Sequence, residues 1–353
     1  MIAYIPGVIG LASNTSWAIM WLAMPLLLLK CKIELNTINI LGLIFLSYAS
    51  LSLLWSPHGM LELLQLFALA SVFVWAATLK DLRRIVLGLS IGLTISAIIA
   101  TLQYFEVETF AFKSTAKSAG LFINSNIYAE TSGMLLLLIL IYKLWWFIPS
   151  ALPGLMVSSR AVVLALGVSI SMMLWAEYKH KIASVSVLIS SWLLAIAMTL
   201  SNSTIIQSSE GTVNLLSVTQ RSNMWQDMLS GFTLFGHGVG SFIYKFPEYN
   251  AHLDTSMFLA EYAHNDLLQL IFELGIGALP LILIVVLLLK VKDAHKYPLI
   301  FFIAVSFFGF PLHMPVTIFM VAIVAAQLSK LSVVRSDFVY NSRSNISNRL
   351  AAT

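Results

Sequence analysis

The sequence has a single cysteine, Cys31, and few charged side chains: only 10% of its 353 residues are Asp, Glu, Lys or Arg. One cysteine excludes an internal disulfide and a cysteine-based metal cluster. An ordinary soluble domain carries about 25% charged residues, whereas 59% of this chain is hydrophobic. No water-soluble fold could bury that much apolar surface, so the composition indicates an integral membrane protein.

The apolar runs also lack the alternating polar pattern of a membrane β-barrel, so we interpret them as transmembrane helices. The net charge of +4 is not a nucleic-acid signal, because the basic residues lie in short clusters between the apolar runs. The start of the chain has no charged segment before its apolar stretch and is interpreted as a retained span, not a cleaved signal peptide. The expected fold is an all-α, polytopic helix bundle forming one membrane domain over residues 1–353.

Runs long enough to approach the thickness of a bilayer predict about twelve spans. Residues 2–29 are also compatible with a single long, tilted span. The predicted spans are Ile2 to Leu11, Ser16 to Leu29, Thr37 to Trp55, Met60 to Leu79, Ile85 to Tyr104, Ile127 to Tyr142, Leu144 to Val157, Ala161 to Trp175, Ile182 to Leu200, Asp266 to Leu289, Tyr297 to Phe310, and Val316 to Leu328.

The basic residues predict the orientation of these spans. Of the twenty Lys and Arg residues, fifteen fall on one face of the predicted bundle, which places that face and both termini in the cytoplasm. The tail at 331–353 is then cytoplasmic, and a long loop at 201–263 lies on the outer face. Long loops in compact proteins are usually functional or disordered. Because this loop is rich in aromatic residues, we expect it to be folded, to contain short interfacial helices and to lie on the bilayer.

Three features of the loop carry candidate chemistry. Arg221 and Trp225 are four residues apart, so they share one face of a short interfacial helix. The segment LFGHGVGSF follows; its glycines predict a tight loop whose backbone closely approaches another element or a ligand. The loop ends in AHND, where Asn265 is expected to cap a span and His264 to lie at the membrane boundary.

In this order, these motifs resemble the O-antigen ligase and polymerase family. The likeness extends upstream to GLFINSNIYAE, which contains Asn124 and Asn126, and to VSSRAVVLAL around Arg160. It covers roughly Gly120 to Pro315, over half of the chain.

The resemblance implies a glycosyltransferase of a bacterial inner membrane with its active site on the periplasmic face. Such enzymes move a glycan from an undecaprenyl diphosphate carrier to an acceptor hydroxyl, with no metal and no other cofactor. The implied acceptor is lipid A core for a ligase, or a second carrier-linked glycan for a polymerase. The short tail favours the ligase, since the large extra domain of protein-glycosylating members is missing.

The residue types fit that chemistry. Arginine holds phosphate oxygens in a fixed fork and stays charged, so Arg160 and Arg221, the two outer-face arginines, are predicted to converge on the diphosphate. Histidine suits a base that is partly neutral near pH 7, and His264 is predicted to fill that role. Inversion at the sugar carbon is expected, because no paired carboxylates suggest a double displacement.

Each of these residues is also compatible with a role outside binding and catalysis. Either arginine is compatible with a lipid-headgroup anchor, and His264 with a helix cap. Asn124, Asn126, His237, Asn265 and His313 are further candidates for substrate or loop contacts.

One acid within the predicted spans, Glu273, is costly to place in a bilayer unless it is paired or faces a cavity. Its carboxylate is compatible with an ion pair to an arginine of a neighbouring span, or with a protonated state.

The competing function is that of a secondary transporter or lipid flippase. It predicts matching broken helices in two halves of the chain, and the sequence shows no such repeat.

Overall fold

The computed structural model of the protein describes residue 31 and residues 36–105, 107, 119–122, 125–156, 160–204, 213–251 and 262–350. Every regular element among them is a helix. The predicted spans Ile2 to Leu11 and Ser16 to Leu29 lie outside these residues.

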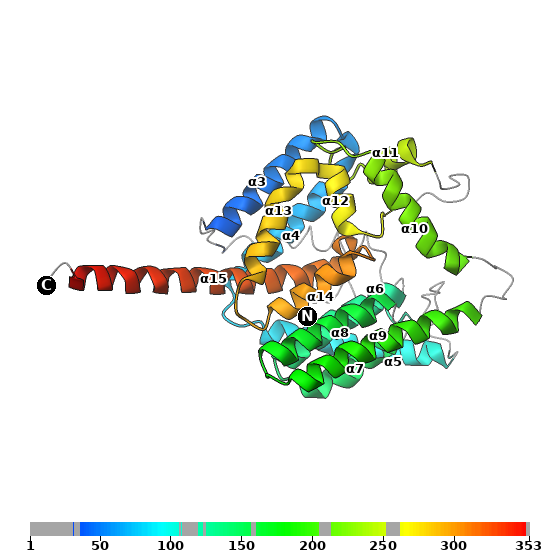
Figure 1. The fold of residues 1–353 in the computed structure, drawn as a ribbon, viewed down its shortest axis with the longest axis horizontal. Coiled ribbons are helices and arrows are strands. Elements are labelled where there is room, and N and C mark those ends of the chain that lie inside the picture. Colours follow the sequence, from blue (N-terminus) through cyan, green and yellow to red (C-terminus); the bar gives the residue numbers. More distant parts are fainter. Residues whose placement is uncertain are drawn as a thin grey trace.

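One group of helices is formed by α3 (Thr37–Leu51), α4 (Met60–Thr78) and a broken helix, α12 (Asp266–Leu274) followed by α13 (Leu279–Leu289). The Asn36 side chain caps α3 by accepting from the Asn39 N–H at 2.9 Å. Short 3₁₀ turns, η2 (Ser52–Leu54) and η3 (Pro57–Gly59), lead into α4. Another 3₁₀ turn, η5 (Gly275–Ala278), separates α12 from α13, which packs on α3. Figure 1 shows this group on one side of the long helix α15.

The second group comprises α5 (Arg83–Tyr104), α6 (Ser125–Ile141), α7 (Ile148–Met156), α8 (Arg160–Ala176) and α9 (Lys181–Thr204), with η4 (Trp145–Phe147) before α7. Figure 1 shows it on the other side of α15. Helices α8 and α9 form a hairpin held by reciprocal hydrogen bonds between Ser171 and Ser184. Gly167 lets the two helices approach closely, since a Cβ there would lie 2.1 Å from Ser191 Oγ.

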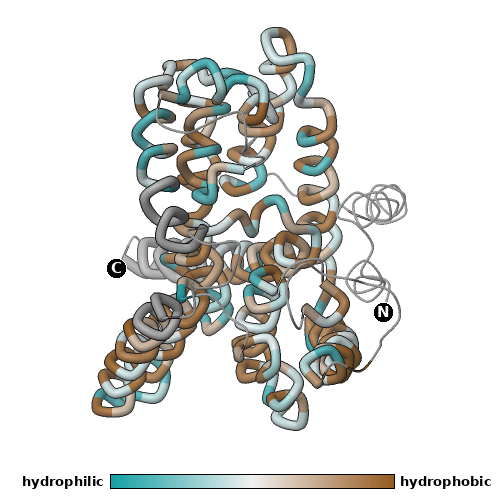
Figure 2. Tube along the Cα trace, turned by 90° about the vertical axis from the view of Figure 1, so that its right-hand side faces the viewer, coloured by the Kyte–Doolittle hydropathy of each residue, from teal (hydrophilic) through white to brown (hydrophobic). Residues whose placement is uncertain are grey.

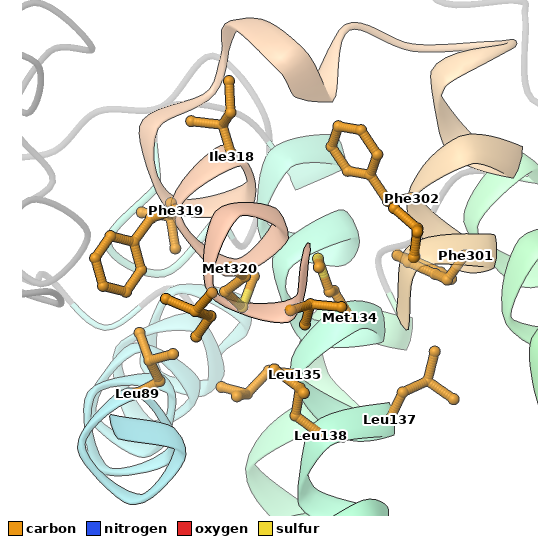
Figure 3. Packing of buried hydrophobic residues seen from close by; sticks show 14 of the residues in the cluster. Leu89, Met134, Leu135, Leu137, Leu138, Phe301, Phe302, Ile318, Phe319 and Met320 are labelled. Carbon is orange, nitrogen blue, oxygen red and sulfur yellow. The ribbon is translucent and has the colours of Figure 1, made fainter. Parts of the chain in front are cut away.

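Between the groups run α14 (Lys296–Ser306), the 3₁₀ turn η6 (Pro311–His313) and α15 (Pro315–Leu350). Side chains of α5, α6, α14 and α15 interlock in the largest apolar core, as Figure 3 shows for Leu89, Met134, Phe301 and Phe319. Because no Pro or Gly follows Pro315 in α15, the predicted last span and the predicted tail form one continuous helix as far as Leu350.

The described part of the predicted long loop contains the end of α9 and two further helices, α10 (Val213–Ser230) and α11 (Phe242–Tyr249). Met224 and Met228 of α10 pack with Phe242, Phe246 and other side chains in a separate apolar cluster. The expectation of helices inside this loop is therefore confirmed, while its location outside the membrane stays a prediction.

Among the described residues, six helical segments are long and apolar enough to cross a membrane. Figure 2 shows how widely hydrophobic residues are spread along the helices. Three more apolar helices are shorter: Ser125–Ile141, Arg160–Ala176 and Lys296–Ser306. The count of about twelve spans is not confirmed. The clearest difference is Leu144 to Val157, which folds as η4 and the nine-residue helix α7 with Pro153 inside it, too short for a bilayer. An apolar run identifies buried or lipid-facing chain but does not fix its helical length.

Candidate functional site

Arg160 and Arg221 lie near each other although 61 positions separate them in the sequence. Arg160 is the first residue of α8, and Arg221 projects from α10 toward the turn after α14, where its guanidinium donates to the Phe308 carbonyl at 3.2 Å. Burial, and next the positive charge of Arg160, lower the pKa of Arg221 below its ordinary value. The charge of Arg160 therefore acts on Arg221, and the convergence of both arginines on one diphosphate site stays a prediction.

An apolar groove of about 350 Å³ adjoins the arginine pair. Its walls come mainly from α8, α14 and the turn after α14, and include Ala161, Leu164, Ile303 and Phe308. Ala161 follows Arg160 directly, and Phe308 is the residue whose carbonyl binds Arg221. Fixed cations beside an apolar groove suit an amphipathic ligand with an anionic head and a hydrocarbon tail.

His264 lies beside this pair, just before α12. Its ring is half-buried and meets the Phe310 ring edge-on, with 5.0 Å between centroids. Burial, and next the positive charge of Arg221, lower the pKa of His264 to about 4. The imidazole is therefore neutral at pH 7, and an unprotonated ring nitrogen is available to accept a proton.

The backbone at His264 is in the left-handed region, with φ of 52°, which is uncommon for a residue other than glycine. Both polar groups of the preceding residue are bonded: the Ala263 N–H donates to Gln269 Oε1 at 3.0 Å, and its carbonyl accepts from Trp225 Nε1 at 2.9 Å. After His264, Asn265 caps α12 by accepting from the Leu268 N–H at 3.0 Å. The predicted cap is confirmed, and neighbours on both sides fix the backbone of His264.

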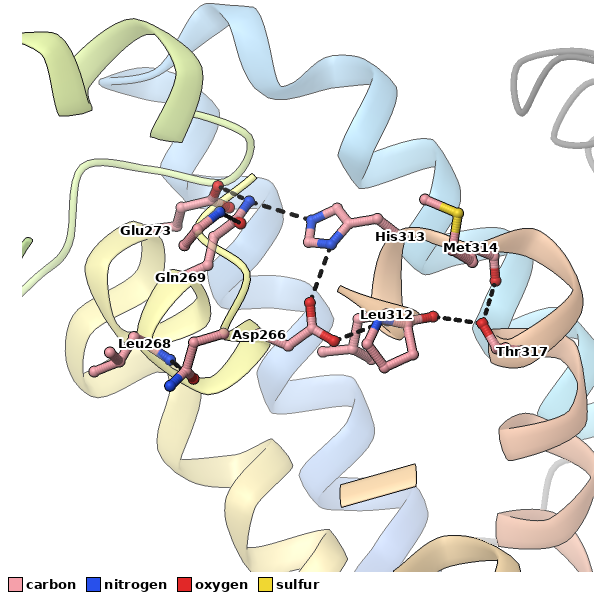
Figure 4. A network of polar contacts seen from close by, with 11 residues as sticks. Asp266, Leu268, Gln269, Glu273, Leu312, His313, Met314 and Thr317 are labelled. Atoms are coloured by element: carbon pink, nitrogen blue, oxygen red, sulfur yellow. Dashed lines mark hydrogen bonds and ion pairs between the residues drawn. The ribbon is translucent and has the colours of Figure 1, made fainter. Parts of the chain in front are cut away.

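A buried polar network runs from the start of α12 to η6, as Figure 4 shows. Asp266 accepts from the Leu312 N–H at 2.9 Å and contacts His313 Nδ1 at 3.2 Å. The other ring nitrogen of His313 lies 3.2 Å from Gln269 Nε2. His313 thus contacts α12 side chains, and its ring also packs on Tyr262.

The glycine-rich loop at 236–240 binds the opposite end of α12. Gly236, Gly238 and Gly240 all have positive φ, and a Cβ on Gly236 would lie 2.3 Å from the Glu273 carbonyl oxygen. The Gly238 N–H donates to that same carbonyl at 2.7 Å. The prediction of a close-approach loop is confirmed, and the element approached is α12.

The side chain of Glu273 also contacts the glycine-rich loop. The sequence is compatible with an ion pair between Glu273 and an arginine, but the partners found are backbone and amide N–H groups. The carboxylate accepts from the Gly240 N–H at 2.8 Å, from the Phe242 N–H at 3.3 Å and from Gln269 Nε2 at 3.1 Å. Glu273 therefore organises the loop through backbone N–H groups.

The remaining sequence candidates are His237, Asn126 and Asn124. His237 Nε2 donates to the Gly231 carbonyl at 2.7 Å, and its ring packs against Tyr249 of the loop and Phe272 of α12. These contacts join the loop to α12. Asn126 is exposed in the first turn of α6. Asn124 lies outside the described residues.

Asp266 and Gln269 were not predicted as site residues. A signal was present: Asp266, Gln269 and Glu273 recur at helical spacing in an otherwise apolar helix, so they share one polar face. Within the described part of the chain, no group of three or more His, Cys, Asp or Glu side chains is arranged to hold a metal ion.

Comparison of the sequence with models of known protein families and with curated proteins finds no match.

Proposed function

We propose that the protein is a membrane glycosyltransferase that moves a glycan from an undecaprenyl diphosphate carrier to an acceptor hydroxyl at the periplasmic face of a bacterial inner membrane. One observation carries the proposal: Arg160, Arg221 and His264 come from three separate segments, yet the charge of Arg160 acts on Arg221 and that of Arg221 acts on His264. The apolar groove is lined by Ala161, which follows Arg160, and by Phe308, whose carbonyl binds Arg221. The motif resemblance to the O-antigen ligase and polymerase family supports the same assignment.

The two arginines bind the diphosphate of the donor. Two like charges repel each other most in a partly buried place; burial lowers the pKa of Arg221, and the charge of Arg160 lowers it further. A bound dianionic group removes the repulsion and accepts charge-assisted hydrogen bonds from both guanidinium groups. The polyprenyl chain then extends along the adjoining groove.

His264 accepts the proton of the attacking hydroxyl. The hydroxyl oxygen forms a bond to the anomeric carbon, the bond from that carbon to the diphosphate oxygen breaks, and the hydroxyl proton moves to the imidazole. Direct displacement inverts the configuration at the carbon. A diphosphate on Arg221 also offsets the positive charge that lowers the pKa of His264, so donor binding strengthens the base.

We favour the ligase, with lipid A core as acceptor, over a polymerase that uses a second carrier-linked glycan. The test is transfer in proteoliposomes containing the whole chain and undecaprenyl diphosphate-linked glycan, with each acceptor supplied separately. Product on lipid A core supports the ligase, and product on the second carrier supports the polymerase. Movement of the donor across the bilayer without transfer to either acceptor would identify a flippase and end the proposal.

A further inference from the structure

His313 closes a circuit of hydrogen bonds around the backbone of His264. The circuit runs from the Ala263 N–H to Gln269 Oε1, from Gln269 Nε2 to His313 Nε2, and from His313 Nδ1 to Asp266 Oδ1. Ala263 precedes His264 by one residue, and Asp266 follows it by two. The circuit therefore holds the chain on both sides of a histidine with left-handed backbone.

The partners of Gln269 determine the protonation state of His313. The Ala263 N–H requires an oxygen, and the Glu273 carboxylate requires a donor, so the amide oxygen faces Ala263 and the NH₂ group faces Glu273. That NH₂ group also faces His313 Nε2, which must then accept a hydrogen bond. His313 completes the circuit only as the neutral ring that carries its proton on Nδ1 and donates it to Asp266.

We propose that His313 is a positioning residue, which holds His264 in its working orientation through a hydrogen-bond circuit that only the neutral His313 ring completes. The proposal rests on the proposed function for the role of His264, but the circuit itself is independent of that role.

A second proton on His313 would open the circuit. The Nε2 atom would then carry an N–H that faces the NH₂ group of Gln269, so two donors would meet. A 180° flip of the Gln269 amide would relieve this clash but would break its hydrogen bonds to Ala263 and Glu273. Charged groups on two helices act on this ring: Asp266 and Glu273 of α12 and Glu62 of α4. Burial alone would lower the pKa of His313, but these carboxylates outweigh it and raise the pKa above the ordinary 6.5.

The positioning role predicts that the rate of glycan transfer falls at low pH because His313 is protonated, and that this fall is distinct from the one caused by protonation of His264. As pH falls through the raised pKa of His313, the circuit opens and transfer declines, while His264, with a pKa of about 4, stays neutral. His313→Gln keeps a hydrogen-bonding side chain that does not titrate, and it should remove this fall in rate. His313→Phe keeps an aromatic ring without polar atoms and should lower kcat by up to about 100-fold, with little change in the KM of the donor.

The experiment uses two readouts on the full chain in proteoliposomes from about pH 5 to 8. One is glycan transfer from the undecaprenyl diphosphate donor to lipid A core, and the other is the rate at which diethyl pyrocarbonate modifies His264, followed by peptide mass spectrometry. We expect His264 in the wild-type protein to be modified faster as pH falls through the pKa of His313, because the opened circuit exposes the ring. His313→Phe should show fast modification at every pH, and His313→Gln a rate that does not change with pH.

The two readouts separate the two proposals. If the wild-type protein transfers no glycan but His264 modification follows His313, the proposed function fails and the positioning role stands. If His313→Phe leaves the modification of His264 at the wild-type rate, the positioning role is wrong, whether or not transfer is lost.

Discussion

The two ends of α12 are both anchored by polar side chains, but to partners of different kinds. At its start, Asp266 and Gln269 bind the titratable ring of His313. At its end, the Glu273 carboxylate binds the backbone N–H groups of Gly240 and Phe242. Backbone N–H groups do not titrate near neutral pH, whereas an imidazole does.

The contact at the start of α12 can therefore change with pH through His313, whereas the partners at its end do not titrate. The end with Glu273 joins the glycine loop to the bundle through backbone N–H groups, whose protonation does not change near neutral pH. The end with His313 holds the proposed base through a group whose charge changes with pH. The predictions below test whether one end governs chemistry and the other stability.

The largest expected effect is that of His264→Ala at the start of α12. A positioned base typically contributes about 10² to 10⁴ in rate, so transfer should fall by roughly that factor, while donor binding and thermal unfolding stay near wild type. Transfer and donor binding are measured together in proteoliposomes. The matched control is His180→Ala, an exposed histidine between α8 and α9. Near-normal transfer by His264→Ala would end the assignment of the base.

Gly236→Ala should produce the largest loss of stability. At φ of 70° a side chain is strained by about 1–3 kcal/mol, and the added Cβ would also lie 2.3 Å from the Glu273 carbonyl oxygen. Thermal unfolding in detergent should shift to a clearly lower temperature. Gly42→Ala is the control, because a Cβ there meets nothing within 4 Å and a helical Gly→Ala change stabilises slightly. Equal unfolding temperatures for the two variants would mean that the loop does not anchor α12.

Glu273→Gln should have a smaller effect on the same end. An amide offers one acceptor oxygen where the carboxylate offers two, so one buried N–H of the loop loses its partner, at about 1–3 kcal/mol. The loss should be measurable by thermal unfolding, with Glu248→Gln as the control, since Glu248 pairs with Lys245 at the exposed surface. Comparable destabilisation by the two substitutions would contradict the anchoring role.

Arg221→Lys should have the smallest of these effects, on the donor alone. Lysine keeps the charge but loses the fork that grips two phosphate oxygens, so donor affinity should fall by about tenfold, or 1.4 kcal/mol. Binding of the undecaprenyl diphosphate donor to the purified protein measures the change. Unchanged affinity would favour the alternative in which Arg221 anchors lipid headgroups.

The features predicted from the sequence are those with a local cause. The cap at Asn265, the close-approach loop at Gly236–Gly240 and the helix around Arg221 follow from side-chain type and spacing over a few residues. The predicted number of spans is not confirmed, because apolar runs such as that of α7 also form short helices. The pairing of Asp266 with His313 was missed because 47 residues separate them, and only the folded chain brings them together.

The length of helix α12 sets the spacing of the two polar contacts at its ends. Its nine residues rise by about 13 Å at about 1.5 Å each, and they set the distance between the histidine at one end and the glycine loop at the other. Insertion of one residue would rotate everything beyond it by about 100° and turn Glu273 away from the face it shares with Asp266 and Gln269. A change in the length of this helix is therefore expected to disturb the site more than a substitution on its apolar side.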